Sequence, residues 1–152
     1  MTVGNISLCG LTVIPVRAHH DDTSEIVTQL FFGEFVKIIQ THKQWIKIEN
    51  LHDNYQGWVD QKQLLPIHTN HINLTSYQNG YQADEELIIS TPWGNQKVIQ
   101  GSPILSLEKS FTLDHYNFTW MDAIPTKSKG GIAQIALSYL NAPYLWGGRS
   151  KY

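Results

Sequence analysis

The sequence predicts a mainly β protein in which two small antiparallel barrels are followed by one α-helix. Short apolar runs alternate with turn residues at spacings of about ten residues through 5–66 and again through 86–121. Near the carboxyl end the apolar period changes from two residues to about 3.6. With 152 residues, 41% of them hydrophobic, the chain is long enough to bury a core in one ordinary domain or two small ones.

The first barrel is predicted from strands that are short and bounded by turn residues. The segment 44–49 alternates most clearly, with Ile46 and Ile48 on one face and polar or aromatic side chains on the other. Closing such strands into a barrel hides their edges. Four strands are expected before residue 67, at 13–17, 34–39, 44–49 and 57–59.

A polar stretch at 68–81 is typical of a linker and precedes a second β-rich block. We interpret this block as a second small barrel, related in architecture to the first. Its expected strands are 86–90, 96–99, 104–107 and 116–121. The predicted boundaries are 1–67 for the first barrel, 68–125 for the linker and second barrel, and 126–152 for the remainder.

A helix of about three turns is predicted near the carboxyl end. Its apolar face would be formed by Ile132, Ile135, Ala136, Tyr139 and Leu140. Asn141 suits the left-handed position that closes a helix, and Pro143 prevents continuation. Burying this face would contribute roughly 25 cal/mol per Å², provided that another apolar surface covers it. Either the second barrel or a further domain would supply that surface.

Charge and composition exclude several function classes. The formal net charge is −2 and the basic residues are dispersed, which argues against a nucleic-acid partner. Met1 is not followed by the basic start and apolar run of a secretion signal, and no stretch is long enough to cross a bilayer. We therefore expect a cytoplasmic protein without a membrane partner. The single cysteine, Cys9, excludes an internal disulfide framework.

Residues 142–150 read Ala-Pro-Tyr-Leu-Trp-Gly-Gly-Arg-Ser, which is loop chemistry with two flat apolar side chains. On the residues alone, Tyr144 and Trp146 suit packing or a binding surface equally well. Arg149 and Ser150 suit either a solvated loop or a site.

The order of residues 142–150 nevertheless resembles the segment that leads into the nucleophile of NlpC-type cysteine peptidases of bacterial cell-wall metabolism. A second resemblance lies near the amino terminus: residues 24–34, with Gly33-Glu34, and Gly57-Trp58-Val59 resemble a bacterial SH3-like barrel of that family. The resemblance implies two SH3-like barrels, with 126–152 beginning a truncated papain-like α+β peptidase domain.

The resemblance also implies a function, that of the γ-D-glutamyl-L-diamino acid endopeptidases and the bacterial dipeptidyl-peptidases. The chain would be the substrate-recognition part of an enzyme that hydrolyses the γ-D-Glu–diamino acid bond of murein peptides, without a cofactor. The catalytic Cys and His would lie beyond Tyr152. We therefore expect the chain as written to be inactive, with the peptidase domain covering the 130–141 helix.

Six residues are implied as the substrate-binding set. Tyr144 and Trp146 would line the cleft beside the nucleophile, and Arg149 and Ser150 would complete the motif. Glu25 and Tyr55, from the first barrel, would receive the ammonium group of a murein peptide with a free N-terminal L-Ala. The full set is Glu25, Tyr55, Tyr144, Trp146, Arg149 and Ser150.

Other readings of the sequence stay open at this point. A non-catalytic tandem SH3-like module that binds wall peptides or a protein partner is the main alternative, and a proline-rich-peptide adaptor is a third class. Cys9 is expected to be a structural thiol. No metal site is expected at 19–22 (His-His-Asp-Asp), because successive residues of an extended segment point to opposite faces, nor from the two ligands His68 and His71.

Overall fold

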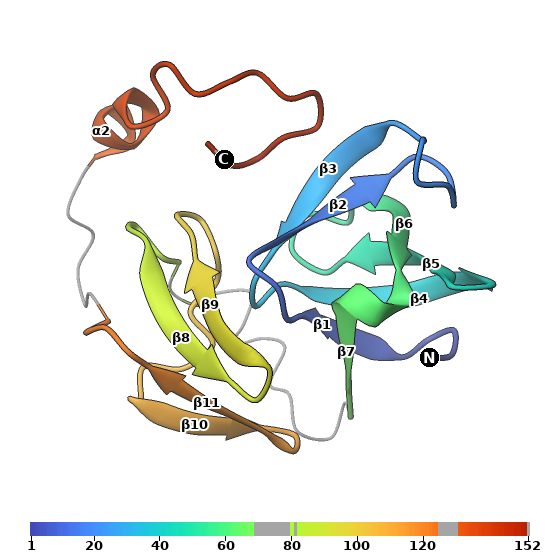
Figure 1. Ribbon diagram of the computed structural model, residues 1–152, viewed down its shortest axis with the longest axis horizontal. Helices are drawn as coiled ribbons and strands as arrows, with labels where there is room; N and C mark the ends of the chain where they lie inside the picture. Colours follow the sequence, from blue (N-terminus) through green and yellow to red (C-terminus); the bar gives the residue numbers. More distant parts are fainter. Residues whose placement is uncertain (69–79, 81, 125–130, 152) are drawn as a thin grey trace.

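The computed structural model describes residues 1–68, 80, 82–124 and 131–151. These residues form two antiparallel sheets, one short α-helix and one 3₁₀ turn (Figure 1), which confirms the expectation of a mainly β fold. Among the described residues, no helix has the length and hydropathy that a bilayer-spanning helix needs. Most of the expected linker, His71 within it, and the boundary at 125/126 lie outside the described residues.

The first sheet has seven strands in the order β3-β2-β6-β5-β4-β1-β7. A 3₁₀ turn, η1 (Gln61–Gln63), joins β6 to β7, and the Asp60 side chain accepts a hydrogen bond from the Lys62 backbone at its start. The strands are β1 (Ile6–Cys9), β2 (Val13–Arg17), β3 (Ile26–Phe31), β4 (Phe35–His42), β5 (Trp45–Asn50), β6 (Gln56–Asp60) and β7 (Leu64–Ile67).

The four strands expected in this region correspond to β2, β4, β5 and β6. The range 13–17 is that of β2, and β5 lies one residue from its expected position. Strand β4 runs three residues further than expected, to His42, because its last residues continue pairing with β5 up to the His42–Trp45 pair. Strands β1, β3 and β7 lie outside these four ranges.

The second sheet has four strands in the order β10-β11-β8-β9. They are β8 (Leu87–Thr91), β9 (Gly94–Val98), β10 (Ser110–Leu113) and β11 (Tyr116–Trp120). The strand expected at 104–107 is wrong: Ile104 and Leu105 pack against the core instead, and the Trp120 indole donates to the Ser106 carbonyl at 3.0 Å. Strand β11 pairs with β8 on one side and with β10 on the other, and the prediction missed β10.

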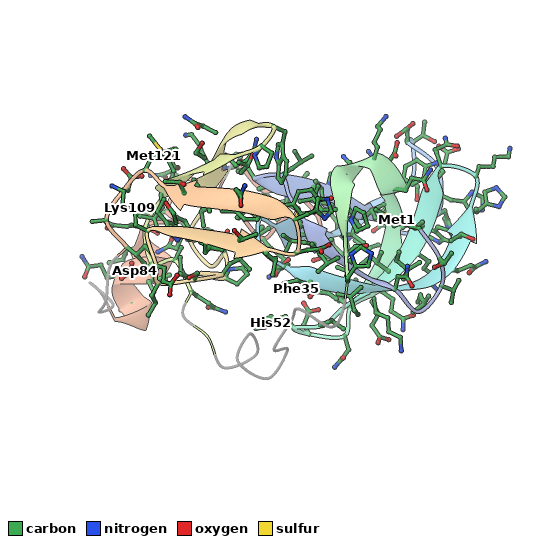
Figure 2. The ribbon with its side chains drawn as sticks, turned by 90° about the horizontal axis from the view of Figure 1, so that it is seen from below. Met1, Phe35, His52, Asp84, Lys109 and Met121 are labelled. Atoms are coloured by element: carbon green, nitrogen blue, oxygen red, sulfur yellow. The ribbon has the colours of Figure 1, made fainter. Side chains whose placement is uncertain are left out.

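One apolar core is shared by both sheets. It contains Ile6, Leu8, Phe32 and Phe35 from the first sheet region together with Leu87, Ile89, Phe118 and Trp120 from the second. Phe35 lies where the sheets meet, and side chains fill the space between them (Figure 2). A second core, which includes Ile14, Ile38 and Ile48, lies within the first sheet. The two sheets therefore do not have separate, complete cores.

Close backbone contacts hold the sheets together. The Trp93 indole donates to the Gly10 carbonyl at 3.1 Å, and the Lys97 amide donates to the Thr12 hydroxyl at 3.2 Å. A Cβ at Gly33, whose φ is +87°, would lie 3.0 Å from the Pro103 carbonyl oxygen. Only glycine suits this approach at this φ.

The predicted helix exists as α2 (Ile132–Leu137), but it is shorter than three turns. After Leu137, the amides of Tyr139 and Leu140 donate hydrogen bonds to the carbonyls three residues earlier, which is a 3₁₀ pattern. The Ser138 hydroxyl donates to the Ile135 carbonyl. Asn141 has φ +67°, which confirms its left-handed closing role. The side chains of Leu137 and Leu140 are exposed, so neither sheet covers them.

Candidate functional site

Residues 142–151, which we call the C-terminal loop, return from α2 to β3 of the first sheet (Figure 1). Gly147 makes the closest approach: its φ is +71°, and a Cβ there would lie 2.5 Å from the Ile26 carbonyl oxygen. The Gly148 amide donates to the Leu145 carbonyl at 2.9 Å and closes the turn. The Gly-Gly pair thus lets the loop backbone lie directly on β3.

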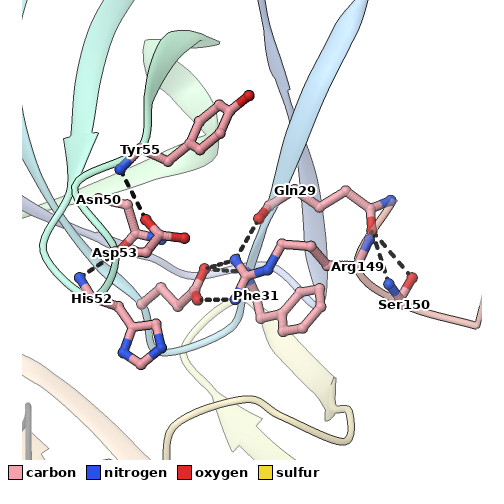
Figure 3. A network of polar contacts seen from close by, with 9 residues as sticks. Gln29, Phe31, Asn50, His52, Asp53, Tyr55, Arg149 and Ser150 are labelled. Carbon is pink, nitrogen blue, oxygen red and sulfur yellow. Dashed lines mark hydrogen bonds and ion pairs between the residues drawn. The ribbon is translucent and has the colours of Figure 1, made fainter. Parts of the chain in front are cut away.

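Arg149 is the main side-chain contact between the loop and the sheet (Figure 3). Its Nη2 lies 2.8 Å from Glu34 Oε1 and its Nη1 3.0 Å from Glu34 Oε2, so the ion pair is bidentate. Nη1 also donates to the Gln29 carbonyl at 2.7 Å, and the guanidinium carbon lies 4.5 Å above the centre of the Phe31 ring.

Gln29 holds the loop backbone beside this ion pair. Its side-chain oxygen accepts from the Arg149 amide at 2.8 Å, from the Ser150 amide at 3.2 Å and from the Ser150 hydroxyl at 3.3 Å. We call the four residues Gln29, Phe31, Glu34 and Arg149 the Arg149 anchor.

The Glu34 carboxylate is buried and needs the cation. Only 2% of Glu34 is exposed, and its Oε2 accepts one further hydrogen bond, from the Phe31 amide at 2.9 Å. A buried carboxylate is costly unless it is paired, so Arg149 compensates a charge that the first sheet carries in its interior. The positive charge of Arg149 on the loop therefore neutralises the buried negative charge of Glu34 in the first sheet.

The aromatic side chains of the loop project into solvent while its backbone is held. Tyr144 is 84% exposed and Trp146 is 62% exposed, and Leu145 between them is also exposed. Single exposed apolar residues are ordinary, but three consecutive ones on an anchored loop form a surface that suits a partner.

Glu25 lies one residue before the part of β3 that the C-terminal loop contacts, and Tyr55 lies between β5 and β6. Glu25 directly precedes Ile26, the residue against which Gly147 packs. Tyr55 is 46% exposed between β5 and β6, where its amide donates to the Asp53 side chain (Figure 3). In the part of the chain that the structure describes, no bond joins Glu25 to Tyr55, and neither side-chain oxygen has a hydrogen-bond partner.

Cys9 is unsuited to nucleophilic chemistry. It lies in β1 with no exposed surface, and its Sγ donates to the Leu11 carbonyl at 3.3 Å. Burial raises the pKa of the Cys9 thiol far above its usual range, so the thiolate is not formed near neutral pH.

The His-rich segment 19–22 forms a polar turn. The amide and hydroxyl of Thr23 both donate to Asp21 Oδ1 at 2.7 Å, and these bonds lower the pKa of Asp21. His20 stacks on His42 with ring centres 4.1 Å apart, beside a surface hollow of about 330 Å³.

Sequence reasoning singled out Arg149 and Ser150 but missed the roles of Gln29 and Glu34. Gly33-Glu34 forms part of the predicted barrel motif, and its local sequence indicates only weakly that the carboxylate is buried. The contacts that define these roles cross 115 to 121 residues of sequence. An acidic residue directly followed by a buried apolar strand was the one available signal.

Comparisons with known proteins agree with the first barrel and with the overall fold. Residues 16–64 match the family model of the bacterial dipeptidyl-peptidase SH3 domain. The crystal structure of an NlpC/P60 family protein from Bacillus cereus ATCC 10987 is similar, with a TM-score of 0.67 and 14% sequence identity, over 96% of this chain and 67% of that chain. No curated protein matches the chain. Residues 16–64 are therefore similar to this type of SH3 domain, and the chain shares its fold with about two thirds of the Bacillus cereus protein.

Proposed function

We propose that this chain is the N-terminal, substrate-selecting part of a cell-wall cysteine peptidase of the NlpC/P60 type. One observation carries the proposal: the Arg149–Glu34 ion pair fixes a loop with exposed Tyr144 and Trp146 against an SH3 domain of the dipeptidyl-peptidase type. An anchored loop with exposed aromatic side chains offers a surface that could bind a substrate and contact a further domain.

The proposed reaction is hydrolysis of the bond between γ-D-glutamate and the diamino acid of a murein peptide, in cytoplasmic recycling of wall fragments. Tyr144 would place its hydroxyl near the reacting carbonyl, and Trp146 would form an apolar wall of the cleft. The thiolate would come from the peptidase domain, since Cys9 is buried. The 152 residues alone would then not cleave the peptide.

Selection of the substrate would rest on Glu25 and Tyr55. A carboxylate and a phenol that have no side-chain partner among the described residues suit an incoming ammonium group, such as that of N-terminal L-Ala. A peptide whose amino group is acylated would leave the Glu25 carboxylate facing an uncharged amide, and this mismatch favours the free peptide.

The peptidase domain is also the proposed partner for the exposed apolar side chains. Leu137 and Leu140 on and after α2, and Tyr144 and Trp146 on the loop, are exposed in the described chain. Covering them would contribute favourable burial at roughly 25 cal/mol per Å².

A binding experiment tests the proposal. Backbone-amide NMR of the 152-residue protein should show shifts near Glu25, Tyr55 and 144–150 when L-Ala-γ-D-Glu-diamino acid tripeptide is added. The N-acetylated tripeptide should give much smaller shifts, and Glu25→Gln should remove the difference between the two. Equal shifts with both peptides would contradict the proposed selection of a free amino terminus.

The second candidate is a tandem SH3-like module that binds wall peptides without cleaving them. It is favoured by the Arg149 anchor itself, which holds the loop in place without any further domain. The reading frame beyond the Tyr152 codon separates the two: Asp-Cys-Ser supports the peptidase, whereas a stop codon supports the binding module. Specific turnover of the tripeptide by the 152 residues, abolished by Cys9→Ala, would contradict both.

A further inference from the structure

We propose that His68, Asp114 and His115 form a binding site for a divalent transition-metal ion of the zinc type. The Nδ1 atom of His68 lies 2.8 Å from Asp114 Oδ2, and the Nδ1 atom of His115 lies 3.2 Å from the same oxygen. One potential ligand atom from each residue lies within 4.8 Å of the other two. This site is separate from the C-terminal loop and does not depend on the proposed peptidase function.

The fold brings these residues together from two different sheets. His68 directly follows β7 of the first sheet, whereas Asp114 and His115 form the turn between β10 and β11 of the second. Asp114 has φ +56°, the left-handed conformation that such a tight turn requires. The His68 amide also approaches Asp114 Oδ2, at 3.4 Å, so the carboxylate has a second contact with His68.

The distances suit a small metal ion. Bonds of about 2.0 Å from zinc to nitrogen or oxygen in a tetrahedral site put neighbouring ligand atoms about 3.3 Å apart. The Asp114–His115 separation of 3.2 Å is close to this value, and the Asp114–His68 separation of 2.8 Å needs only a small opening. Both imidazoles are largely exposed, 77% for His68 and 62% for His115, so the His68 ring has room to rotate, while the His115 ring lies against Tyr116 with ring centres 4.0 Å apart.

The donor set selects the class of ion. Two imidazoles and one carboxylate suit Zn²⁺, Ni²⁺ or Cu²⁺, whereas Mg²⁺ and Ca²⁺ prefer sites made of oxygen atoms. The exposed side of the cluster leaves room for water to complete the coordination shell. Because the ligands belong to both sheets, the bound ion would link the end of β7 to the β10–β11 turn and stabilise their junction.

Calorimetric titration of the untagged 152-residue protein with ZnCl₂ or NiCl₂ in a non-chelating buffer tests the site. We expect one ion per chain with a dissociation constant in the micromolar range, and no heat of binding from MgCl₂. Asp114→Asn and His115→Ala should each weaken binding about tenfold or more. Asparagine tolerates the left-handed conformation at 114, so that variant keeps the turn. The matched control His52→Ala, which removes another exposed histidine, should bind as the parent does.

Two results of the binding experiments would overturn the metal site. One is unchanged zinc affinity in Asp114→Asn and His115→Ala, with both variants folded by circular dichroism. The other is loss of binding in His42→Ala, which would assign the ion to the stacked His20–His42 pair instead. As a second readout, saturating zinc should raise the thermal midpoint of the parent and not that of His115→Ala. A midpoint in the parent that does not respond to zinc would also count against the proposal.

Discussion

Arg149 and Glu34 form a bidentate ion pair, at 2.8 and 3.0 Å, between the C-terminal loop and the interior of the first sheet. The pair is asymmetric, because Glu34 is buried whereas Arg149 is partly exposed. Removing one partner therefore has a different effect from removing the other.

Replacing Arg149 with methionine should destabilise the protein more than replacing Glu34 with glutamine. Arg149→Met leaves a buried carboxylate without its cation and should lower the free energy of unfolding by about 1–3 kcal/mol, whereas Glu34→Gln leaves a cation that can reach water. Urea unfolding of both variants and of the double variant measures the difference. Lys62→Met, which breaks the exposed Lys62–Asp60 pair, is the control and should change little. A larger loss in Glu34→Gln than in Arg149→Met would contradict this account.

Gly147→Ala should release the C-terminal loop from β3. The new Cβ would lie 2.5 Å from the Ile26 carbonyl oxygen at a residue whose φ is +71°, so the backbone must move at a cost of about 1 kcal/mol or more. Amide hydrogen exchange should speed up at Arg149 and Ser150, whose amides bond to Gln29. Gly131→Ala, where a Cβ meets no atom within 4 Å, serves as the comparison. Unchanged exchange at both amides in Gly147→Ala would show that this contact does not hold the loop.

Cys9 should make the protein less stable as the solution becomes alkaline. Burial raises the pKa of the folded-state thiol, so the folded state keeps a proton that the unfolded chain loses above a pKa of about 8.5. The free energy of unfolding should therefore fall with rising pH above that value, by about 1.4 kcal/mol per pH unit from this group. Urea unfolding between pH 7 and pH 10 should show a shallower decline in Cys9→Ala than in the parent. Parallel pH profiles for the two proteins would be inconsistent with a buried neutral thiol.

Phe118→Ala should weaken both sheets together. Phe118 is buried in the shared core, and removing its ring should cost about 3–5 kcal/mol. Because Ile6 and Leu8 belong to the same core, hydrogen-exchange protection should fall in β1 as well as in β8 and β11. Met121→Ala, at an exposed position, should leave protection unchanged. Loss of protection confined to residues 87–120 would mean that the sheets unfold separately.

The sequence predicted those strands whose residues alternate between apolar and polar within a single short segment. The segment 44–49 alternates strictly and lies within one residue of β5, and the range of β2 was predicted. The run 104–107 has strand composition but packs Ile104 and Leu105 on the shared core, which no local pattern reveals. The predicted helix is longer than α2, which ends at Leu137, where the Ser138 hydroxyl donates a hydrogen bond to the Ile135 carbonyl.

The candidate site likewise contains residues that the sequence could predict and residues that only the fold identifies. Arg149 and Ser150 stand in a recognisable motif, whereas Gln29 and Glu34 acquire their roles only when the chain returns over more than a hundred residues. Asp114 and His115 likewise meet His68 only because the β10–β11 turn reaches the end of β7.

The apolar core common to both sheets determines how the protein can be divided. Expressed alone, residues 1–67 would lack the second-sheet residues that pack against Ile6, Leu8, Phe32, Phe35 and Ile67 in the shared core. A fragment that exposes such apolar side chains is prone to self-association. Residues 1–67 should therefore be expressed and engineered together with residues 82–120.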